Sequence, residues 1–177
     1  RHAGWIAASG GLAKDQIGDA PHIILFPEVP FSREKFIDKV ELTVSKKGYC
    51  VVVASEGIRY RDGAHISGSL HKDAFGHQQL GGVAPALASM IKRSTGYKYH
   101  WALADYLQRS ARHLASKTDV QQSYAVGRQA VRLALQGKTS VMVTINRNKG
   151  FDYGWSLGEA CLKKVANKEK KIPRSFI

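Results

Sequence analysis

The chain has 177 residues, of which 44% are hydrophobic and 23% are charged, as in an ordinary globular domain. It has no apolar run near the roughly 20 residues that a membrane-spanning helix needs, and two scattered cysteines give neither a disulfide framework nor a zinc site. A formal net charge of +13 predicts an anionic partner, which could be a nucleic acid, a membrane surface or a phosphorylated metabolite.

The first half of the chain alternates apolar runs with amphipathic stretches. Residues 22–26 predict a buried strand that ends at Pro27. A helix capped by Ser32 should follow and end at Gly48, because apolar residues recur at helical spacing between them. The β-branched run 50–54 predicts a second strand, and a polar loop with several glycines should follow it.

The second half continues the same alternation. A helix is expected from Leu80 to Gly96, and the aromatic stretch 99–107 predicts a third strand. The capping box 118–121 begins the next helix, in which Val120, Tyr124, Gly127, Val131 and Ala134 should form a buried stripe. Residues 141–145 predict a strand and 158–171 a final helix.

This order predicts an α/β fold, a mainly parallel sheet with helices on both faces. We expect an α/β region over residues 1–150, followed by a C-terminal helix and a basic tail over residues 151–177. Ligands of such sheets bind beyond the carboxyl ends of the strands, so side chains that follow the predicted strands are the candidates for a site.

Glu28 follows the first predicted strand, and Pro27 and Pro30 restrict its backbone. Its carboxylate could accept hydrogen bonds from two sugar hydroxyls, or it could be an acid that merely precedes the next helix. Tyr106 and Arg109 follow the third predicted strand. The planar fork of arginine suits a phosphate, although a surface arginine and a core tyrosine would explain the spacing equally simply. Arg112 could extend the basic patch.

Four segments, taken together and in this order, resemble the phosphofructokinase family, specifically its pyrophosphate-dependent branch. They are 1–5 (Arg-His-Ala-Gly-Trp), 26–28 (Phe-Pro-Glu), 76–82 (Gly-His-Gln-Gln-Leu-Gly-Gly) and 106–110 (Tyr-Leu-Gln-Arg-Ser). The resemblance implies that the chain is the C-terminal portion of a longer two-domain protein. It also implies that residues 1–150 bind a sugar phosphate.

The reaction implied by the resemblance is phosphoryl transfer from pyrophosphate to fructose 6-phosphate, giving fructose 1,6-bisphosphate in glycolysis. Arg1 would contact the sugar phosphate, Glu28 would hold its hydroxyls, and Tyr106 and Arg109 would bind its 6-phosphate end. His100 stands where many members carry an arginine that reaches a neighbouring subunit's site, so His100 and Arg112 are further candidates for phosphate binding.

The family's donor loop, its Mg²⁺ ligands and its catalytic Asp base all precede the position of Arg1. The resemblance therefore implies that this chain contains no catalytic residue, that Mg²⁺ is bound upstream, and that the chain alone is inactive. It further implies a homodimer or homotetramer. Two cysteines without a pairing pattern fit a reducing cytoplasm, and we expect neither nucleic acid nor membrane as a partner.

Three alternatives remain open at this point. The enzyme could use ATP instead of pyrophosphate, because the donor contacts lie outside the sequence. The chain could belong to a sugar-phosphate sensor that binds without reacting. The high net charge alone would also allow a nucleic-acid-binding module, although Trp5, Trp101 and Trp155 lie in apolar or glycine-rich contexts and not among basic residues.

Overall fold

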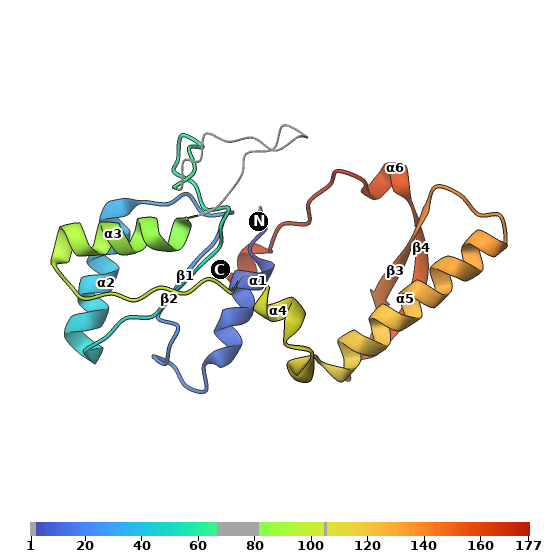
Figure 1. Cartoon of the computed structure of the whole chain (residues 1–177), viewed down its shortest axis with the longest axis horizontal. Coiled ribbons are helices and arrows are strands. Elements are labelled where there is room, and N and C mark those ends of the chain that lie inside the picture. Colours follow the sequence, from blue (N-terminus) through green and yellow to red (C-terminus); the bar gives the residue numbers. More distant parts are fainter. Residues whose placement is uncertain (1–2, 67–81, 105) are drawn as a thin grey trace. The chain divides into compact units, whose positions relative to one another are not determined.

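The computed structural model describes residues 3–66, 82–104 and 106–177, without the side chains of Gln108 and Arg109. The chain divides into two compact units (Figure 1). The first unit comprises Arg1–Leu103 and Glu169–Ile177, and the second comprises Ala104–Lys168. Each unit has a two-stranded sheet of its own among the residues described.

The first unit is built around the parallel strands β1 (Ile23–Leu25) and β2 (Val52–Ala54), which pair with Ile23 opposite Val52. The other elements are two helices, two short 3₁₀ turns and one short helix near the start of the chain. They are α1 (Trp5–Ser9), η1 (Gly10–Ala13), α2 (Arg33–Lys47), α3 (Val83–Thr95) and η3 (Arg174–Phe176).

Helices cover both faces of this strand pair, which confirms the predicted α/β class. Successive residues of a strand point to opposite faces, and Ile23 and Val52 pack with α2 and α3. On the other face, a Cβ atom built on Gly10 of η1 would lie 3.2 Å from the Val53 side chain. That close approach explains why glycine occupies position 10.

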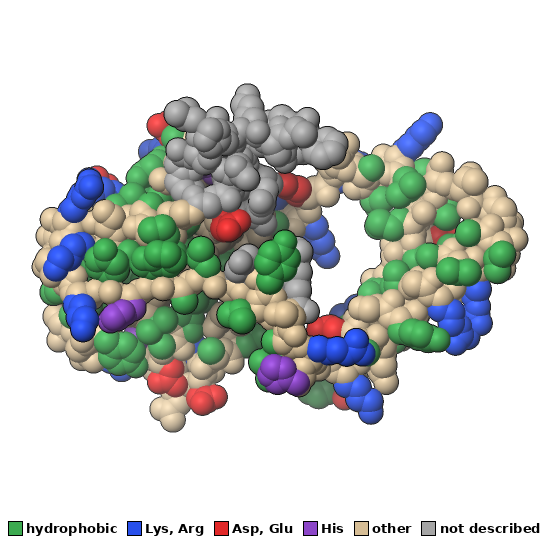
Figure 2. Space-filling view, viewed as in Figure 1, with side chains coloured by type: hydrophobic (Ala, Val, Ile, Leu, Met, Phe, Trp, Pro, Cys, Tyr) green, Lys and Arg blue, Asp and Glu red, His purple; other side chains and the backbone are tan. Residues whose placement is uncertain are grey.

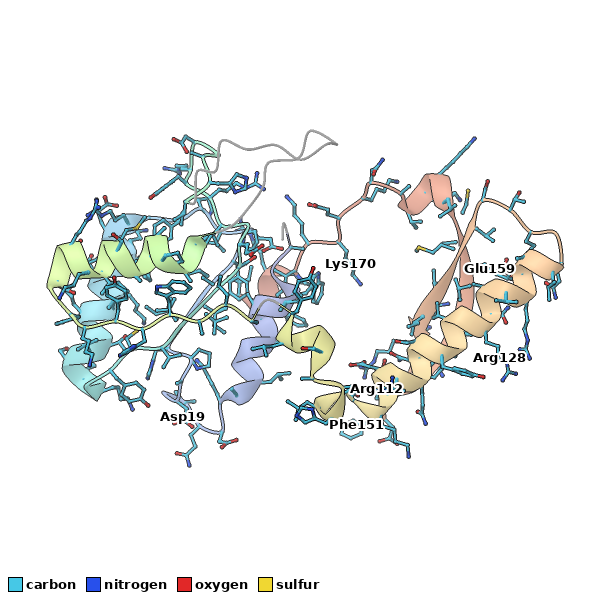
Figure 3. All side chains as sticks on the ribbon, viewed as in Figure 1. Asp19, Arg112, Arg128, Phe151, Glu159 and Lys170 are labelled. Atoms are coloured by element: carbon cyan, nitrogen blue, oxygen red, sulfur yellow. The ribbon has the colours of Figure 1, made fainter. Side chains whose placement is uncertain are left out.

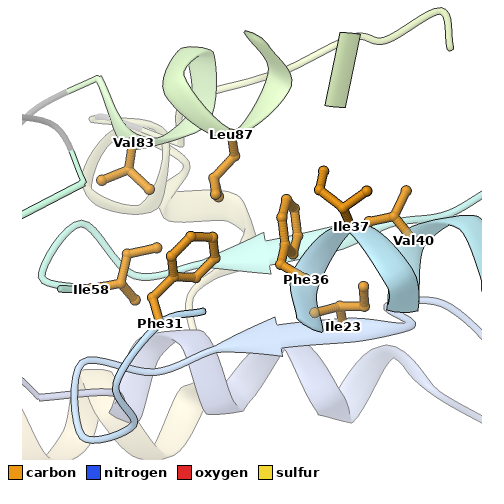
Figure 4. Close-up of a cluster of buried hydrophobic side chains, with 8 residues drawn as sticks. All are labelled: Ile23, Phe31, Phe36, Ile37, Val40, Ile58, Val83 and Leu87. Carbon is orange, nitrogen blue, oxygen red and sulfur yellow. The ribbon is translucent and has the colours of Figure 1, made fainter. Parts of the chain in front are cut away.

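The core of the first unit lies between the strands, α2 and α3, where the buried side chains meet (Figure 4). Burying each large aliphatic or aromatic side chain contributes about 1.5–3 kcal/mol before the entropy of ordering is subtracted. The cluster comprises Ile23, Phe31, Phe36, Ile37, Val40, Ile58, Val83 and Leu87.

Local signals set both ends of α2 and the C-terminal end of α3 as predicted, whereas the predicted start of the latter helix at Leu80 lies outside the described residues. The Ser32 hydroxyl accepts a hydrogen bond from the Lys35 N–H at 3.3 Å, and Gly48 ends α2 with φ 80°. Gly96 ends α3 with φ 73°. These left-handed conformations favour glycine because it has no Cβ.

The predicted strand over 99–107 is wrong. Residues 97–104 pair with none of the strands that the structure describes, and a short helix, α4 (Leu107–Ser110), occupies the end of the predicted range. A strand is defined by hydrogen bonds to a neighbour. The aromatic stretch is therefore an extended segment outside the sheet, in which Tyr99 and Trp101 are exposed.

The second unit contains an antiparallel hairpin where the sequence predicted a strand and then a helix. The hairpin joins β3 (Val141–Arg147) to β4 (Trp155–Cys161), with Val141 opposite Cys161. The predicted helix over 158–171 is wrong apart from the short α6 (Leu162–Val165). Pairing with β3 overrides the helical propensity of this basic segment. The hairpin continues toward its turn with a hydrogen bond from the Asn148 N–H to the Gly154 carbonyl at 2.9 Å.

The long helix α5 (Lys117–Leu135) forms as predicted, but its cap and its buried face differ. After the 3₁₀ turn η2 (Arg112–Leu114), Ser116 caps the helix by accepting from the Asp119 N–H at 3.4 Å. The helix buries Leu133 and Gln122, and Gln122 donates to the Tyr153 hydroxyl at 2.7 Å.

The residues predicted to form the buried stripe of α5 lie on the opposite side of the helix. At about 100° per residue, Val131 lies roughly 160° from Leu133. The exposed fractions of Val120, Tyr124 and Val131 are 46%, 72% and 60%. Figure 2 shows apolar side chains on the surface of this unit. Across the described ranges, no helix is both long and apolar enough to cross a bilayer.

Candidate functional site

Glu28 lies three residues beyond the end of β1, at the carboxyl edge where the sequence predicted a site. The chain turns there, and the Val29 N–H donates to the Phe26 carbonyl at 3.3 Å. Pro27 and Pro30 restrict the backbone on both sides. Glu28 does not cap α2, since Ser32 performs that role, so its carboxylate is available for other partners.

The carboxylate of Glu28 joins three segments that are distant in the sequence. Its Oε1 atom accepts one hydrogen bond from the Gly4 N–H at 3.0 Å and another from the Ile172 N–H at 3.0 Å. Gly4 directly precedes α1, and Ile172 belongs to the segment that returns to the first unit. Hydrogen bonds to a charged acceptor are stronger than neutral ones, so this oxygen is firmly held.

The second oxygen of Glu28, Oε2, is buried and has no hydrogen-bond partner among the described residues. A Cβ atom at position 4 would lie 2.9 Å from Oε2 and 2.6 Å from Phe26 Cδ1. Glycine at position 4 therefore makes room for this oxygen. A buried charged oxygen without a donor is costly, so Oε2 is the atom of this carboxylate that still lacks a hydrogen-bond donor.

The surroundings of Glu28 favour its ionised form. Partial burial alone would raise the pKa of Glu28, but the Ile172 and Gly4 N–H groups that donate to its carboxylate, together with the favourable effect of its own backbone N–H, outweigh burial. With the positive charge of Lys171, they hold the pKa of the carboxyl below its usual value. The resulting stabilisation is present above the ordinary carboxyl pKa of about 4.3 and is lost as the pH falls through the lower folded value.

Tyr106 and Arg109 lie in the second unit, at α4. Tyr106 occupies the position before the first helical residue, and its carbonyl accepts from both the N–H and the hydroxyl of Ser110 at 2.9 Å. The Tyr106 side chain is 64% exposed, so it is not a core residue of this unit. Arg109 lies one helical turn further along, and its side chain falls outside the described part of the structure.

The remaining candidates are spread over both units. His100 is exposed in the extended segment of the first unit, and Arg112 is exposed in η2 of the second unit (Figure 3). Arg1 and most of the segment 76–82 lie outside the described residues; Gly82, its last residue, precedes α3 with φ 82°. The shared crevice that would contain both Glu28 and Arg109 stays a prediction, because these residues belong to different units.

Sequence reasoning located Glu28 but missed its two partners. Gly4 was part of a recognised segment, yet its role beside the carboxylate needed the structure. Ile172 contributes a backbone N–H, which every residue except proline has, so the amino-acid sequence does not reveal this contact. Among the described residues, no group of three His, Cys, Asp or Glu side chains could hold a metal ion.

Comparisons with known proteins agree with one another. The family profile described as phosphofructokinase matches residues 1–134. A pyrophosphate–fructose 6-phosphate 1-phosphotransferase of Halomonas elongata is 59% identical over 177 residues, which are 100% of this chain and 42% of that protein. Its counterpart from Methylococcus capsulatus is 54% identical over 177 residues, again 100% of this chain and 42% of the relative.

A solved structure shows the same similarity. The crystal structure of a pyrophosphate-dependent phosphofructokinase from Marinobacter aquaeolei matches with a TM-score of 0.82 and 55% sequence identity. The match covers 100% of this chain and 41% of that chain. The chain thus spans about two fifths of the length of the relatives that it matches.

Proposed function

Because the chain belongs to the phosphofructokinase family, we propose that the whole protein transfers a phosphoryl group from pyrophosphate to fructose 6-phosphate. The product is fructose 1,6-bisphosphate. The observation that carries this proposal is the 59% identity, over all 177 residues, with a relative that is named for this reaction. The excess of basic residues suits substrates that carry several phosphate charges.

Within that reaction, this part of the protein supplies groups that hold the sugar phosphate. Glu28 accepts a hydrogen bond from a sugar hydroxyl through Oε2, since Oε1 already has two donors. Tyr106 and Arg109 bind the 6-phosphate end of the sugar, and Arg1 makes a further contact with the sugar phosphate. His100 and Arg112, which lie close to Tyr106 and Arg109 in the sequence, are further candidates for phosphate binding. Phosphoryl transfer depends mainly on positioning and on charge stabilisation, and these residues serve the positioning.

Enzymes of this family generally use Mg²⁺, but the described residues do not fit such a site. They include no cluster of three candidate ligands, and we assign no step of the reaction to the metal here. We propose that the metal ligands and the catalytic base belong to the part of the whole protein that the relatives contain beyond this match. The protein would act in the cytoplasm as a homodimer or homotetramer.

The test is a steady-state assay of the purified whole protein with fructose 6-phosphate and Mg²⁺, using pyrophosphate or ATP as the donor. We expect turnover with pyrophosphate and little or none with ATP. Turnover with ATP alone would reject the donor assignment. Saturable binding of fructose 6-phosphate without turnover from either donor would indicate a sensor and reject the proposal. The isolated 177-residue chain should show no turnover.

The role of Arg109 can be tested in the same assay. Arg109→Ala should raise the KM for fructose 6-phosphate about 10-fold or more, which corresponds to losing a charged hydrogen bond. The KM for pyrophosphate should stay within about twofold. Arg93→Ala, which removes an exposed arginine near the end of α3, is the matched control and should change neither constant. Equal increases in both KM values for Arg109→Ala would mean that Arg109 is structural.

A further inference from the structure

The last residues of the chain, Glu169–Ile177, return from the second unit to pack on the first. We name this segment the C-terminal strap. Ile172 at its centre is only 4% exposed, although its neighbours in the sequence are exposed. A single buried residue in an otherwise exposed segment indicates a specific attachment point.

Trp5 of α1 holds the strap by three contacts. The indole Nε1–H donates to the Lys170 carbonyl at 2.6 Å, and the Lys170 ammonium lies 5.7 Å from the centre of the Trp5 ring. The Phe176 ring meets the Trp5 ring edge-on, with 6.0 Å between the ring centres. Figure 3 shows Lys170 on this strap. Contacts on both sides of position 172 fix the direction of the backbone there.

Held in this way, the strap aims its backbone at Glu28. The Ile172 N–H donates to Oε1 at 3.0 Å, while Gly4 supplies the other donor to the same oxygen. Together the two N–H groups fix Oε1, and with it the direction in which Oε2 points. The strap thus contacts the Glu28 carboxylate through a backbone N–H at position 172.

We propose that Ile172 is a positioning residue for sugar-phosphate binding, and that the C-terminal strap orients Glu28 through the Ile172 N–H. This inference rests on the proposed function of Glu28. The strap should matter for the binding of the sugar phosphate and not for the phosphoryl donor, because its contact is with the carboxylate that holds sugar hydroxyls.

The strap also affects the charge of that carboxylate. α1 carries no titratable side chain, and the turn around Glu28 carries no other. On the strap, Lys171 acts on Glu28 through its positive charge, whereas Lys170 lies over Trp5. Removing the Ile172 N–H or the Lys171 charge should raise the pKa of Glu28. As the pH is lowered, Glu28 should then become protonated at a higher pH than in the wild-type enzyme, and sugar binding should weaken at that higher pH.

The experiment measures KM values of the whole enzyme from pH 8 down to about pH 4, which reaches the ordinary carboxyl pKa of about 4.3. Ile172→Pro removes the N–H donor, and Ile172→Val is the matched control that keeps it. We expect Ile172→Pro to raise the KM for fructose 6-phosphate about 10-fold, as for the loss of one charge-assisted hydrogen bond. The KM for pyrophosphate should stay within about twofold. The acid limb, which is the rise in the KM for fructose 6-phosphate as the pH is lowered, should move to higher pH.

Lys171→Gln gives a second, independent measurement if Ile172→Pro does not fold. It keeps the backbone donor but removes the charge, so it should move the acid limb in the same direction with little change in KM at pH 8. Wild-type acid limbs in both Lys171→Gln and Ile172→Pro, or equal KM increases for both substrates, would overturn the inference. An inactive wild-type enzyme would instead overturn the proposed function on which it rests.

Discussion

At the scale of single residues, Gly4 is the most constrained position beside the proposed site. Its backbone conformation has a negative φ of −83°, so any residue could adopt it. The requirement for glycine comes from space alone, because a Cβ atom would approach both Phe26 and Glu28 closer than 3.0 Å. Glycine here therefore serves the carboxylate and not the turn.

Gly4→Ala in the whole enzyme should destabilise the fold by about 1–3 kcal/mol, the usual cost of overpacking. It should also raise the KM for fructose 6-phosphate, because the added methyl group displaces the Glu28 carboxylate. Urea unfolding and steady-state kinetics measure the two effects. Gly11→Ala is the control, since its Cβ would lie at an ordinary 3.6 Å from Ile24. Equal stability and equal KM values for the Gly4→Ala and Gly11→Ala enzymes would contradict the claim that Glu28 and Phe26 leave room only for glycine at position 4.

At the scale of elements, α2 depends on a cap that the sequence makes visible. The Ser32 hydroxyl accepts from the Lys35 N–H, one of the helix's first donors, which would otherwise lack a partner within the helix. Ser32→Ala should lower the free energy of unfolding by about 1 kcal/mol. Ser45→Ala, within the exposed face of the same helix, should be neutral or slightly stabilising because alanine favours helix. Equal urea midpoints for the two variants would show that the cap contributes nothing.

The elements also show where sequence reasoning succeeded and why it stopped. Residues within a few positions of each helix end, such as Ser32, Gly48 and Gly96, determine those ends, so α2 and α3 were predictable. The segment 99–107 and β4 depended on whether a distant strand offered hydrogen bonds, which no local pattern reports. Glu28 was identified by its place after β1, but the donor at position 172 lies 144 residues away and is a backbone group.

At the scale of the whole molecule, the second unit has little core of its own. Among the residues of this unit whose burial the structure describes, Leu133 is the buried apolar one, while Val120, Tyr124, Val131 and Leu135 of α5 are exposed. An isolated two-stranded hairpin is at best marginally stable and depends on what packs against it. The relatives extend over more than twice the length of this chain, so we expect the remainder of the whole protein to cover this face of α5.

The isolated 177-residue chain should therefore bind a hydrophobic dye such as ANS strongly, and the whole protein should bind it weakly. Val131→Lys should reduce dye binding to the isolated chain, yet destabilise the whole protein, because a charge would then be buried. Arg132→Lys changes the residue next to Val131 without changing its charge, so it is the control for both measurements. Strong dye binding by the whole protein would mean that this face stays uncovered.

The return of the strap to the first unit has a consequence for biosynthesis. Glu28 leaves the ribosome 144 residues ahead of its partner Ile172, a delay of about 7–30 s at ordinary translation rates. Throughout that interval the nascent acid has at most one of its two amide donors. A ribosome-bound chain that has not yet reached Ile172 would therefore hold the Glu28 carboxylate by one backbone hydrogen bond instead of two, although β1 and β2 have already been synthesised.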